Sequence, residues 1–296
     1  MTKKNYLAIF AKSFNWAGFF LPKIIYNDCS KLYAFCRVLD DLVDEEADLE
    51  LKTERFYKIK DIFKRIYEQN DFDEKAIDQT EQKLIIKDMI LIADNNNIKK
   101  IILDDLIEGV SSDLKSKVHL RSVKDLLVYS YRVAGTVGIM MAKILNVNDT
   151  RSLKGAIDLG IAMQLTNIAR DVIEDKKMNR QYIEPDFENI EATLKLADMF
   201  YDSSFTSIKN IPFKYRFAII VARRVYREIG NKILKKGNMS NYEQSGKIYI
   251  NNFGKLFQTF LSLFDLLILF LKNIEPHQRI KEHEIISEEV NLDERI

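Results

Sequence analysis

Residues 164–185 read QLTNIARDVIEDKKMNRQYIEP and combine an apolar helical stretch with regularly spaced polar groups. Asn167, Asp171 and Asp175 follow one another at four-residue steps, which places them on one face of a helix over two turns. Burying such groups without partners would cost several kcal/mol. The stretch therefore predicts a bundle helix whose polar face lines a site.

Residues 33–45 read YAFCRVLDDLVDE and form a second acidic helix. Asp40 and Asp44 are four residues apart, so their carboxylates lie on one helical face about 6 Å apart along the axis. Like charges at that spacing destabilise an isolated helix, and a bound cation would remove this cost. Alone, such a pair is equally typical of a solvated helix end. Two such helices facing one another across a bundle core predict an oxygen-lined cage for Mg²⁺.

Two arginines accompany the acidic residues and indicate what the cage holds. Arg37 lies one turn before Asp40, and Arg170 is next to Asp171. Guanidinium groups pair bidentately with phosphate oxygens, which favours a metal–diphosphate complex as the ligand. The alternative is a salt bridge from each arginine to its neighbouring aspartate, and both interpretations are compatible. No glycine-rich nucleotide loop is found in the sequence.

The rest of the chain predicts an all-α fold in a single domain. Ten glycines and four prolines punctuate 296 residues, and apolar residues recur at three- and four-residue steps over long segments. We expect residues 1–274 to form this domain and residues 275–296 to form a charged, solvated and partly disordered tail. The net charge of +1 favours no nucleic-acid partner.

Several further segments carry weaker predictions. Cys29 and Cys36 are seven residues apart in one helix, too far for a disulfide, and are expected to be buried thiols. His119, His277 and His283 show no metal-ligand spacing. Residues 253–271 predict an amphipathic helix. We favour a core-facing position for it over a surface resting on a membrane, because it lacks a basic polar face.

The acidic stretches resemble the two aspartate-rich motifs of the squalene/phytoene synthase family. YRVAGTVGIMMA at residues 131–142 resembles its mid-chain glycine motif, and KSFNWAGFFLP at residues 12–22 resembles its N-terminal flap. LIEGVSSDL at residues 106–114 and RRVYREIGNKIL at residues 223–234 are weaker matches in the same order. The resemblance covers roughly residues 8–260. It implies an isoprenoid synthase helical bundle, all-α and single-domain, around a central cavity.

The resemblance also implies roles for individual residues. One set would hold Mg²⁺, with Mn²⁺ as a substitute: Asp40, Asp44, Asn167, Asp171 and Asp175. A second set would contact diphosphate or order the cage: Lys12, Ser13, Arg37, Gln164, Arg170, Tyr182 and Lys247. A third set would line the cavity near the reacting carbons: Phe14, Tyr33, Tyr131, Val133 and Gly138. For Phe14, Tyr33 and Val133, plain core packing is an equal alternative. Lys247 stands where family members commonly have arginine, so it keeps the charge but loses the bidentate fork.

The reaction implied is the head-to-head condensation of two prenyl diphosphates through a cyclopropylcarbinyl diphosphate. The motifs are most similar to bacterial phytoene synthases, which use geranylgeranyl diphosphate and no nicotinamide cofactor. Squalene or dehydrosqualene synthesis from farnesyl diphosphate, a terpene cyclase and a non-catalytic assembly factor are the competing hypotheses. The substrates and product imply a cytoplasmic enzyme with peripheral contact to the inner face of the membrane and a downstream desaturase.

Overall fold

The structure is a computed structural model that describes residues 5–45, 48–69, 80–271, 277 and 280–296. The domain boundary expected after residue 274 lies outside these residues. The N-terminal half comprises α1 (Tyr6–Phe10), α2 (Lys12–Gly18), α3 (Lys23–Asp44), α4 (Leu49–Gln69), α5 (Thr80–Asn95), α6 (Lys100–Ser111), η2 (Ser112–Leu114), β1 (Val118–His119), α7 (Val123–Ser130), η3 (Tyr131–Gly135) and α8 (Thr136–Ile144). The C-terminal half comprises α9 (Thr150–Lys177), β2 (Arg180–Gln181), α10 (Phe187–Phe205), η4 (Thr206–Asn210), α11 (Phe213–Leu234), α12 (Met239–Gln244), α13 (Asn252–Leu271), α14 (Lys281–Ser287) and α15 (Leu292–Arg295).

The all-α prediction is confirmed, with one small addition. Strands β1 and β2 pair in parallel, with Val118 opposite Arg180 and His119 opposite Gln181. Each strand has two residues, too few for any alternation pattern to be visible in the sequence. The pair ties the end of α9 to the segment before α7.

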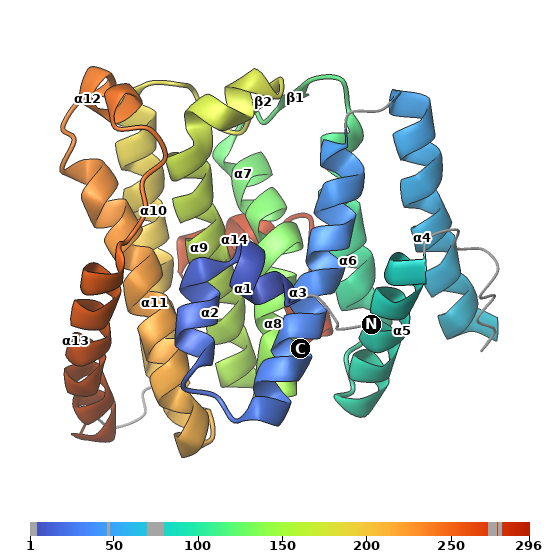
Figure 1. The fold of residues 1–296 in the computed structure, drawn as a ribbon, viewed down its shortest axis with the longest axis horizontal. Coiled ribbons are helices and arrows are strands. Elements are labelled where there is room, and N and C mark those ends of the chain that lie inside the picture. The colour runs from blue at the N-terminus through green and yellow to red at the C-terminus, as the bar shows by residue number, and fades with distance from the viewer. Residues whose placement is uncertain (1–4, 46–47, 70–79, 272–276, 278–279) are drawn as a thin grey trace.

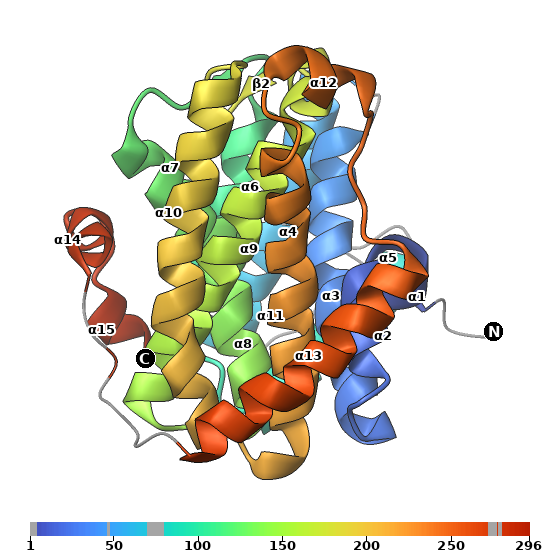
Figure 2. The ribbon, with the colours of Figure 1, turned by 90° about the vertical axis from the view of Figure 1, so that its left-hand side faces the viewer.

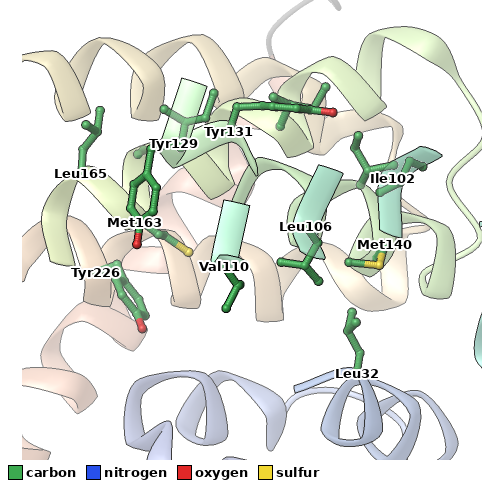
Figure 3. Close-up of a cluster of buried hydrophobic side chains, with 14 of the residues drawn as sticks. Leu32, Ile102, Leu106, Val110, Tyr129, Tyr131, Met140, Met163, Leu165 and Tyr226 are labelled. Atoms are coloured by element: carbon green, nitrogen blue, oxygen red, sulfur yellow. The ribbon is translucent and has the colours of Figure 1, made fainter. Parts of the chain in front are cut away.

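Helix α9 is the central helix of the bundle and packs against α8, α10 and α11, while α3 and α6 lie farther from it and pack against α8 (Figures 1 and 2). Its buried residues include Leu153, Ile161 and Ala169, and they occupy most of its circumference, as expected for a helix covered on all sides. The Asp149 carboxylate begins the helix by accepting a hydrogen bond from the Ser152 N–H at 2.9 Å. Figure 3 shows part of the buried apolar cluster, to which α9 contributes Met163 and Leu165 and α6 contributes Leu106.

The acidic ends of α3 and α9 lie at the same end of the bundle, at the top of Figure 1. Asp44 is the last residue of α3, and Asp175 lies in the last turn of α9. The helix dipole places partial negative charge at these C-terminal ends, which disfavours carboxylates there. The fold therefore concentrates negative charge at one end of the bundle.

The C-terminal segment is docked on the bundle, so the expectation of a solvated, partly disordered tail is wrong for its described residues. Helices α14 and α15 bury Ile286 and Leu292. Arg295 pairs with Asp105 of α6 at 2.9 Å. Charged composition alone did not reveal these contacts, because the partners are buried acids on distant helices.

Helix α13 forms where the sequence predicts it, but its orientation is the reverse of the expected one. Lys255, Gln258 and Ser262 are buried, while Phe253 and Phe270 are 79% and 70% exposed. The polar stripe therefore faces the bundle and the apolar face points outward.

Both cysteines are free thiols, as predicted; Cys29 is buried as expected, while Cys36 is only partly buried. Burial raises the pKa of the Cys29 thiol to about 12, so it stays protonated and unreactive at neutral pH.

Candidate active site

An acidic cavity lies between the C-terminal ends of α3 and α9. The residues that the sequence predicts as metal ligands all line it: Asp40, Asp44, Asn167, Asp171 and Asp175. Oxygen atoms from two helices thus surround one space, as the four-residue spacings require.

Two of these carboxyls titrate far above the usual range. Asp40 lines the cavity, and its side chain is exposed there although the surrounding helices crowd it. Burial, followed by the charge of Asp44, raises the pKa of Asp40 to about 7. Burial, followed by the charge of Asp171, raises the pKa of Asp175 to about 7. The cavity therefore holds more negative charge than its own cations neutralise.

Buried oxygen atoms without partners are a second sign that the cavity suits a cation. Asn167 Oδ1 and Asp113 Oδ1 are buried and accept no hydrogen bond from the described residues. Leaving such atoms unsatisfied costs about 1–3 kcal/mol each. Carboxylate and amide oxygens are hard donors that suit a divalent cation such as Mg²⁺. The residues present therefore fit an oxygen-coordinated metal.

Basic side chains surround the acidic residues and hold them in place. Arg180 pairs with Asp44 at 2.7 Å, and Lys247 pairs with Asp171 at 2.9 Å. The Nε of Arg170 donates to Asp171 at 2.8 Å. Arg170 lowers the pKa of Asp171 below its ordinary value, against the opposing effect of burial. Asp171 therefore stays ionised at lower pH than Asp175, whose pKa lies at about 7.

The predicted salt bridges of the arginines are present. Arg37 pairs with Asp41, one turn along α3, and Arg170 pairs with Asp171. Five described residues to which the resemblance gives a diphosphate role line neither this acidic cavity nor the apolar cavity described below: Lys12, Ser13, Arg37, Arg170 and Lys247. Gln164 and Tyr182 line the acidic cavity.

An apolar cavity adjoins the acidic one and runs through the bundle. Phe14, Tyr33, Val133 and Gly138 line it, with further apolar residues of α1, α3, α8 and α9. Asp40, Gln164 and Asn167 line both cavities, so the two spaces meet at the metal-competent side chains. Such a space can hold an elongated hydrocarbon with a polar head at the acidic end.

Tyr131 does not line either cavity, so its predicted place beside the reacting carbons is wrong. Its hydroxyl donates to Asp105 at 2.8 Å, on the side of α6 and the C-terminal segment. The chain forms a π-helical turn at Tyr131–Gly135, and this register shift changes which side chains face inward. Figure 3 shows Tyr129 and Tyr131 pointing in different directions.

Sequence reasoning missed Tyr129, Asp113 and Arg180, which all line the acidic cavity. The Tyr129 hydroxyl donates to Asp113 at 2.7 Å, and its ring stacks on Tyr182 with centroids 4.8 Å apart. Asp113 and Arg180 both lie in stretches that match the family motifs, so the order of polar residues in those stretches was the available signal. Tyr129 precedes the quoted glycine motif.

Gly138 lines the apolar cavity and also allows α8 to approach α9. A Cβ atom at Gly138 would lie 2.1 Å from the carbonyl oxygen of Ala156, and one at Gly160 would lie 2.2 Å from that of Ala134. The glycine motif therefore brings backbones together at the wall of the cavity.

A buried cluster of Asp158, His277 and His283 joins the C-terminal segment to α9. His277 Nε2 and His283 Nε2 lie 2.6 Å and 2.7 Å from the Asp158 carboxylate, and Ser203 donates to the same carboxylate. The histidines are six residues apart and 119 residues or more from Asp158 in the chain, so spacing did not indicate the cluster. Its ligand atoms are close enough together to hold a metal ion.

The hydrogen bonding of His283 favours a latch over a metal centre in this cluster. The Ile280 N–H donates to His283 Nδ1 at 3.0 Å, so Nδ1 carries no proton and Nε2 donates to Asp158. A metal-bound histidine ordinarily donates its other ring N–H to an acceptor. The cluster is thus satisfied by its own hydrogen bonds.

Comparison with known proteins links this geometry to one family. The squalene/phytoene synthase family model matches residues 9–186. The 15-cis-phytoene synthase of Paracoccus sp. (strain N81106 / MBIC 01143) is 33% identical over 254 residues, covering 79% of this chain and 81% of that protein. That of Pantoea ananas is 28% identical, covering 79% and 82%.

Solved structures share the fold. A dehydrosqualene synthase in complex with a ligand is 26% identical, with a TM-score of 0.68 over 88% of this chain and 94% of that one. A squalene synthase from Alicyclobacillus acidocaldarius is 18% identical, with a TM-score of 0.59 over 76% and 89%.

Proposed function

The chain belongs to the squalene/phytoene synthase family and is a prenyltransferase, and from this premise we propose that it condenses two geranylgeranyl diphosphates head to head to phytoene. Relatives called phytoene synthase match over more than three quarters of this chain. The observation that carries the proposal is the junction of an acidic and an apolar cavity at Asp40, Gln164 and Asn167.

Members of this family depend on a divalent metal, and this chain's residues fit one. We propose that Mg²⁺, with Mn²⁺ as a substitute, is held by the predicted set: Asp40, Asp44, Asn167, Asp171 and Asp175. Bound there, the metal neutralises negative charge on the diphosphate leaving group. No nicotinamide cofactor is needed for phytoene.

The basic residues would complete the diphosphate end. Arg180, Lys247 and Arg170 already pair with the acidic residues at distances of 2.9 Å or less. Their charges orient the carboxylates and offset part of the repulsion between them. We place the diphosphate contact at Gln164, Tyr182 and Arg180, which line the cavity itself.

The apolar cavity would hold both prenyl chains and exclude water. Ionisation of one substrate releases diphosphate and leaves an allylic cation. The cationic carbon then bonds to a double bond of the second substrate, and a proton is lost. The resulting cyclopropylcarbinyl diphosphate loses its own diphosphate, rearranges and loses a second proton. Aromatic faces such as those of Phe14 and Tyr33 stabilise the cations between these steps.

The decisive experiment is product analysis with purified protein, Mg²⁺ and radiolabelled substrates. Geranylgeranyl diphosphate should give a forty-carbon hydrocarbon and two diphosphates per product, without NADPH. A product that appears only from farnesyl diphosphate would replace this proposal with dehydrosqualene synthesis, or with squalene synthesis where NADPH is required. The similarity to a dehydrosqualene synthase structure favours that second candidate.

A terpene cyclase and a non-catalytic assembly factor would each give a distinct result in the same experiment. A cyclase would give a monomeric product from one substrate molecule, so the product mass identifies it. An assembly factor would give no product with any prenyl diphosphate, and its function in cells would survive Asp171→Ala.

We further propose that residues 1–274 are the prenyl transferase domain. We also propose that the enzyme is cytoplasmic with peripheral contact to the inner face of the membrane, and that a desaturase takes up its product. The support for the membrane contact and the desaturase is chemical, because both substrate and product carry long hydrocarbon chains that partition into lipid.

A further inference from the structure

Helix α13 (Asn252–Leu271) is attached to the bundle through its polar side chains. Trp16 Nε1 donates to Thr259 Oγ1 at 2.9 Å. Arg224 donates to Gln258 Oε1 at 3.2 Å and to Asp265 at 2.7 Å. Hydrogen bonds to α2 and α11 therefore fix which face of the helix points inward.

The opposite face of α13 consists of large apolar side chains that are exposed. We call this set the α13 apolar face: Phe253, Leu256, Phe257, Phe260, Leu263, Phe264, Leu267, Ile268, Phe270 and Leu271. The helix is long and apolar enough to cross a membrane by composition, and 28% of its apolar window is buried. Contiguous exposed apolar surface of this kind marks an interaction site.

The chemistry of this face favours lipid over protein as its partner. Every residue of α13 is described, and from Leu256 to Leu271 its polar side chains Gln258, Thr259, Ser262 and Asp265 all turn toward the bundle. Protein interfaces ordinarily carry about one hydrogen bond per 100–200 Å². Acyl chains offer no hydrogen-bonding groups, so a face without polar side chains suits them.

Positive charge lies beside exposed apolar residues at the same end of the bundle. Helices α3 and α11 both begin at the lower end in Figure 1, toward which α13 also runs. Lys23 and Ile24 begin α3, Phe213 and Lys214 begin α11, and all four are exposed. Neither helix has an acidic residue in its first turn. Lysines in this position attract anionic headgroups.

We propose that the α13 apolar face docks on an anionic lipid bilayer, with Lys23 and Lys214 against the headgroups. Trp16 connects α13 to α2, and Phe14, Ala17 and Gly18 of α2 line the apolar cavity. Docking therefore sets a wall of the substrate cavity next to the lipid, while the acidic cavity stays at the far end of the bundle. This deepens the membrane contact proposed above by naming its surface.

Vesicle flotation of the full chain tests the surface without any substrate, so its outcome is independent of the reaction. Wild-type protein is mixed with phosphatidylcholine vesicles, with or without phosphatidylglycerol. A variant with Phe260→Gln, Phe264→Gln and Leu267→Gln should bind at least roughly tenfold more weakly, because each substitution removes apolar area from the bilayer. The matched control, Leu84→Gln with Leu91→Gln on α5, replaces equally exposed leucines on another helix and should bind as wild type does.

A second variant tests the contribution of the two lysines to binding. Lys23→Gln with Lys214→Gln should weaken binding to phosphatidylglycerol vesicles and leave phosphatidylcholine binding unchanged. Equal flotation of wild type and the α13 variant, or no flotation of wild type with either vesicle, would overturn the proposal. So would a wild-type dimer in light scattering that the α13 variant converts to monomer, since a second copy would then cover the face. Circular dichroism of each variant shows that its helices remain folded.

Discussion

Asp40 and Asp175 make the stability of the protein depend on pH in an unusual direction. Each has a pKa of about 7 in the folded chain, above that of an unfolded aspartate. The folded state therefore binds protons that the unfolded state has lost. This contribution to stability is complete below the unfolded pKa near about 4 and is lost as pH rises through about 7.

We expect the melting temperature of the metal-free protein to decrease as the pH rises from about 4 to about 7, because these two groups then lose their protons. Millimolar Mg²⁺ should stabilise the protein above pH 7 and have little effect at pH 5, since ligands must be deprotonated to bind. Thermal unfolding followed by circular dichroism, with and without Mg²⁺, measures both effects. Asp40→Asn is the control, and an unchanged pH profile in that variant would contradict the assignment.

Lys247 provides a second prediction for a single residue. Its Nζ lies 2.9 Å from Asp171, and an arginine there would pair through two nitrogens. Lys247→Ala should lower kcat/KM by about 10–100-fold, because it frees a carboxylate that orients the site. Lys247→Arg should stay within a few-fold of wild type. Steady-state diphosphate release measures both, and equal losses in the two variants would show that position 247 requires lysine for another reason.

The sequence predicted the positions of the acidic residues around one space and misplaced the tyrosine, for a physical reason. Asp40, Asp44, Asp171 and Asp175 follow from four-residue spacing, which any regular helix obeys. Tyr131 lies at the start of a π-helical turn, where the regular count fails, and it bonds to Asp105 instead of facing the cavity. The positions of single residues could therefore be predicted where the helix was regular, and their roles stay predictions.

Among whole elements, the C-terminal segment is fastened by Asp158, which is fully buried on α9. Hydrogen bonds from His277 and His283 hold the pKa of Asp158 below its ordinary value, against the effect of burial. A depressed pKa contributes stability above the unfolded value, and this is lost in acid as pH falls through the folded value.

Asp158→Ala should destabilise the protein by about 1–3 kcal/mol for each buried donor that loses its acceptor, because the groups that bond to this carboxylate would be left unsatisfied. We expect a lower free energy of unfolding in urea titrations at pH 7, with a smaller difference between the two proteins below about pH 4. In Mg²⁺-free buffer, a chelator should leave the wild-type melting temperature unchanged, because the latch needs no metal. A large fall with chelator and its rescue by Zn²⁺ would instead identify the cluster as a metal centre.

Element positions were predictable from periodicity, but their orientations were less so. The helix at residues 252–271 was located from its apolar spacing, yet its apolar face points outward. Periodicity shows that a helix has two unlike faces, and partners decide which one is buried. Here Trp16 and Arg224, distant in sequence, supply hydrogen bonds to the polar stripe.

Across the whole molecule, the two cavities place charge and hydrocarbon at opposite ends. Helix α9 runs from the lower end to the acidic end and borders both spaces. A substrate with its diphosphate at Asp171 would extend its chain toward the end of α8 and the start of α9. The depth of the apolar cavity would then select the chain length, a property that no motif in the sequence encodes.

Ala142, near the end of α8, lines that deep region and tests the selection. Ala142→Phe fills space that only the longer chain needs, so kcat/KM for geranylgeranyl diphosphate should fall by about 10–200-fold relative to farnesyl diphosphate. Ala142→Ser keeps the volume and should keep the wild-type ratio. Competition between the two labelled substrates in one reaction measures the ratio directly and cancels differences in the amount of folded enzyme. If both substrates lose activity equally in Ala142→Phe, the end of α8 does not border the chain terminus, and the substrate lies in the cavity in another direction.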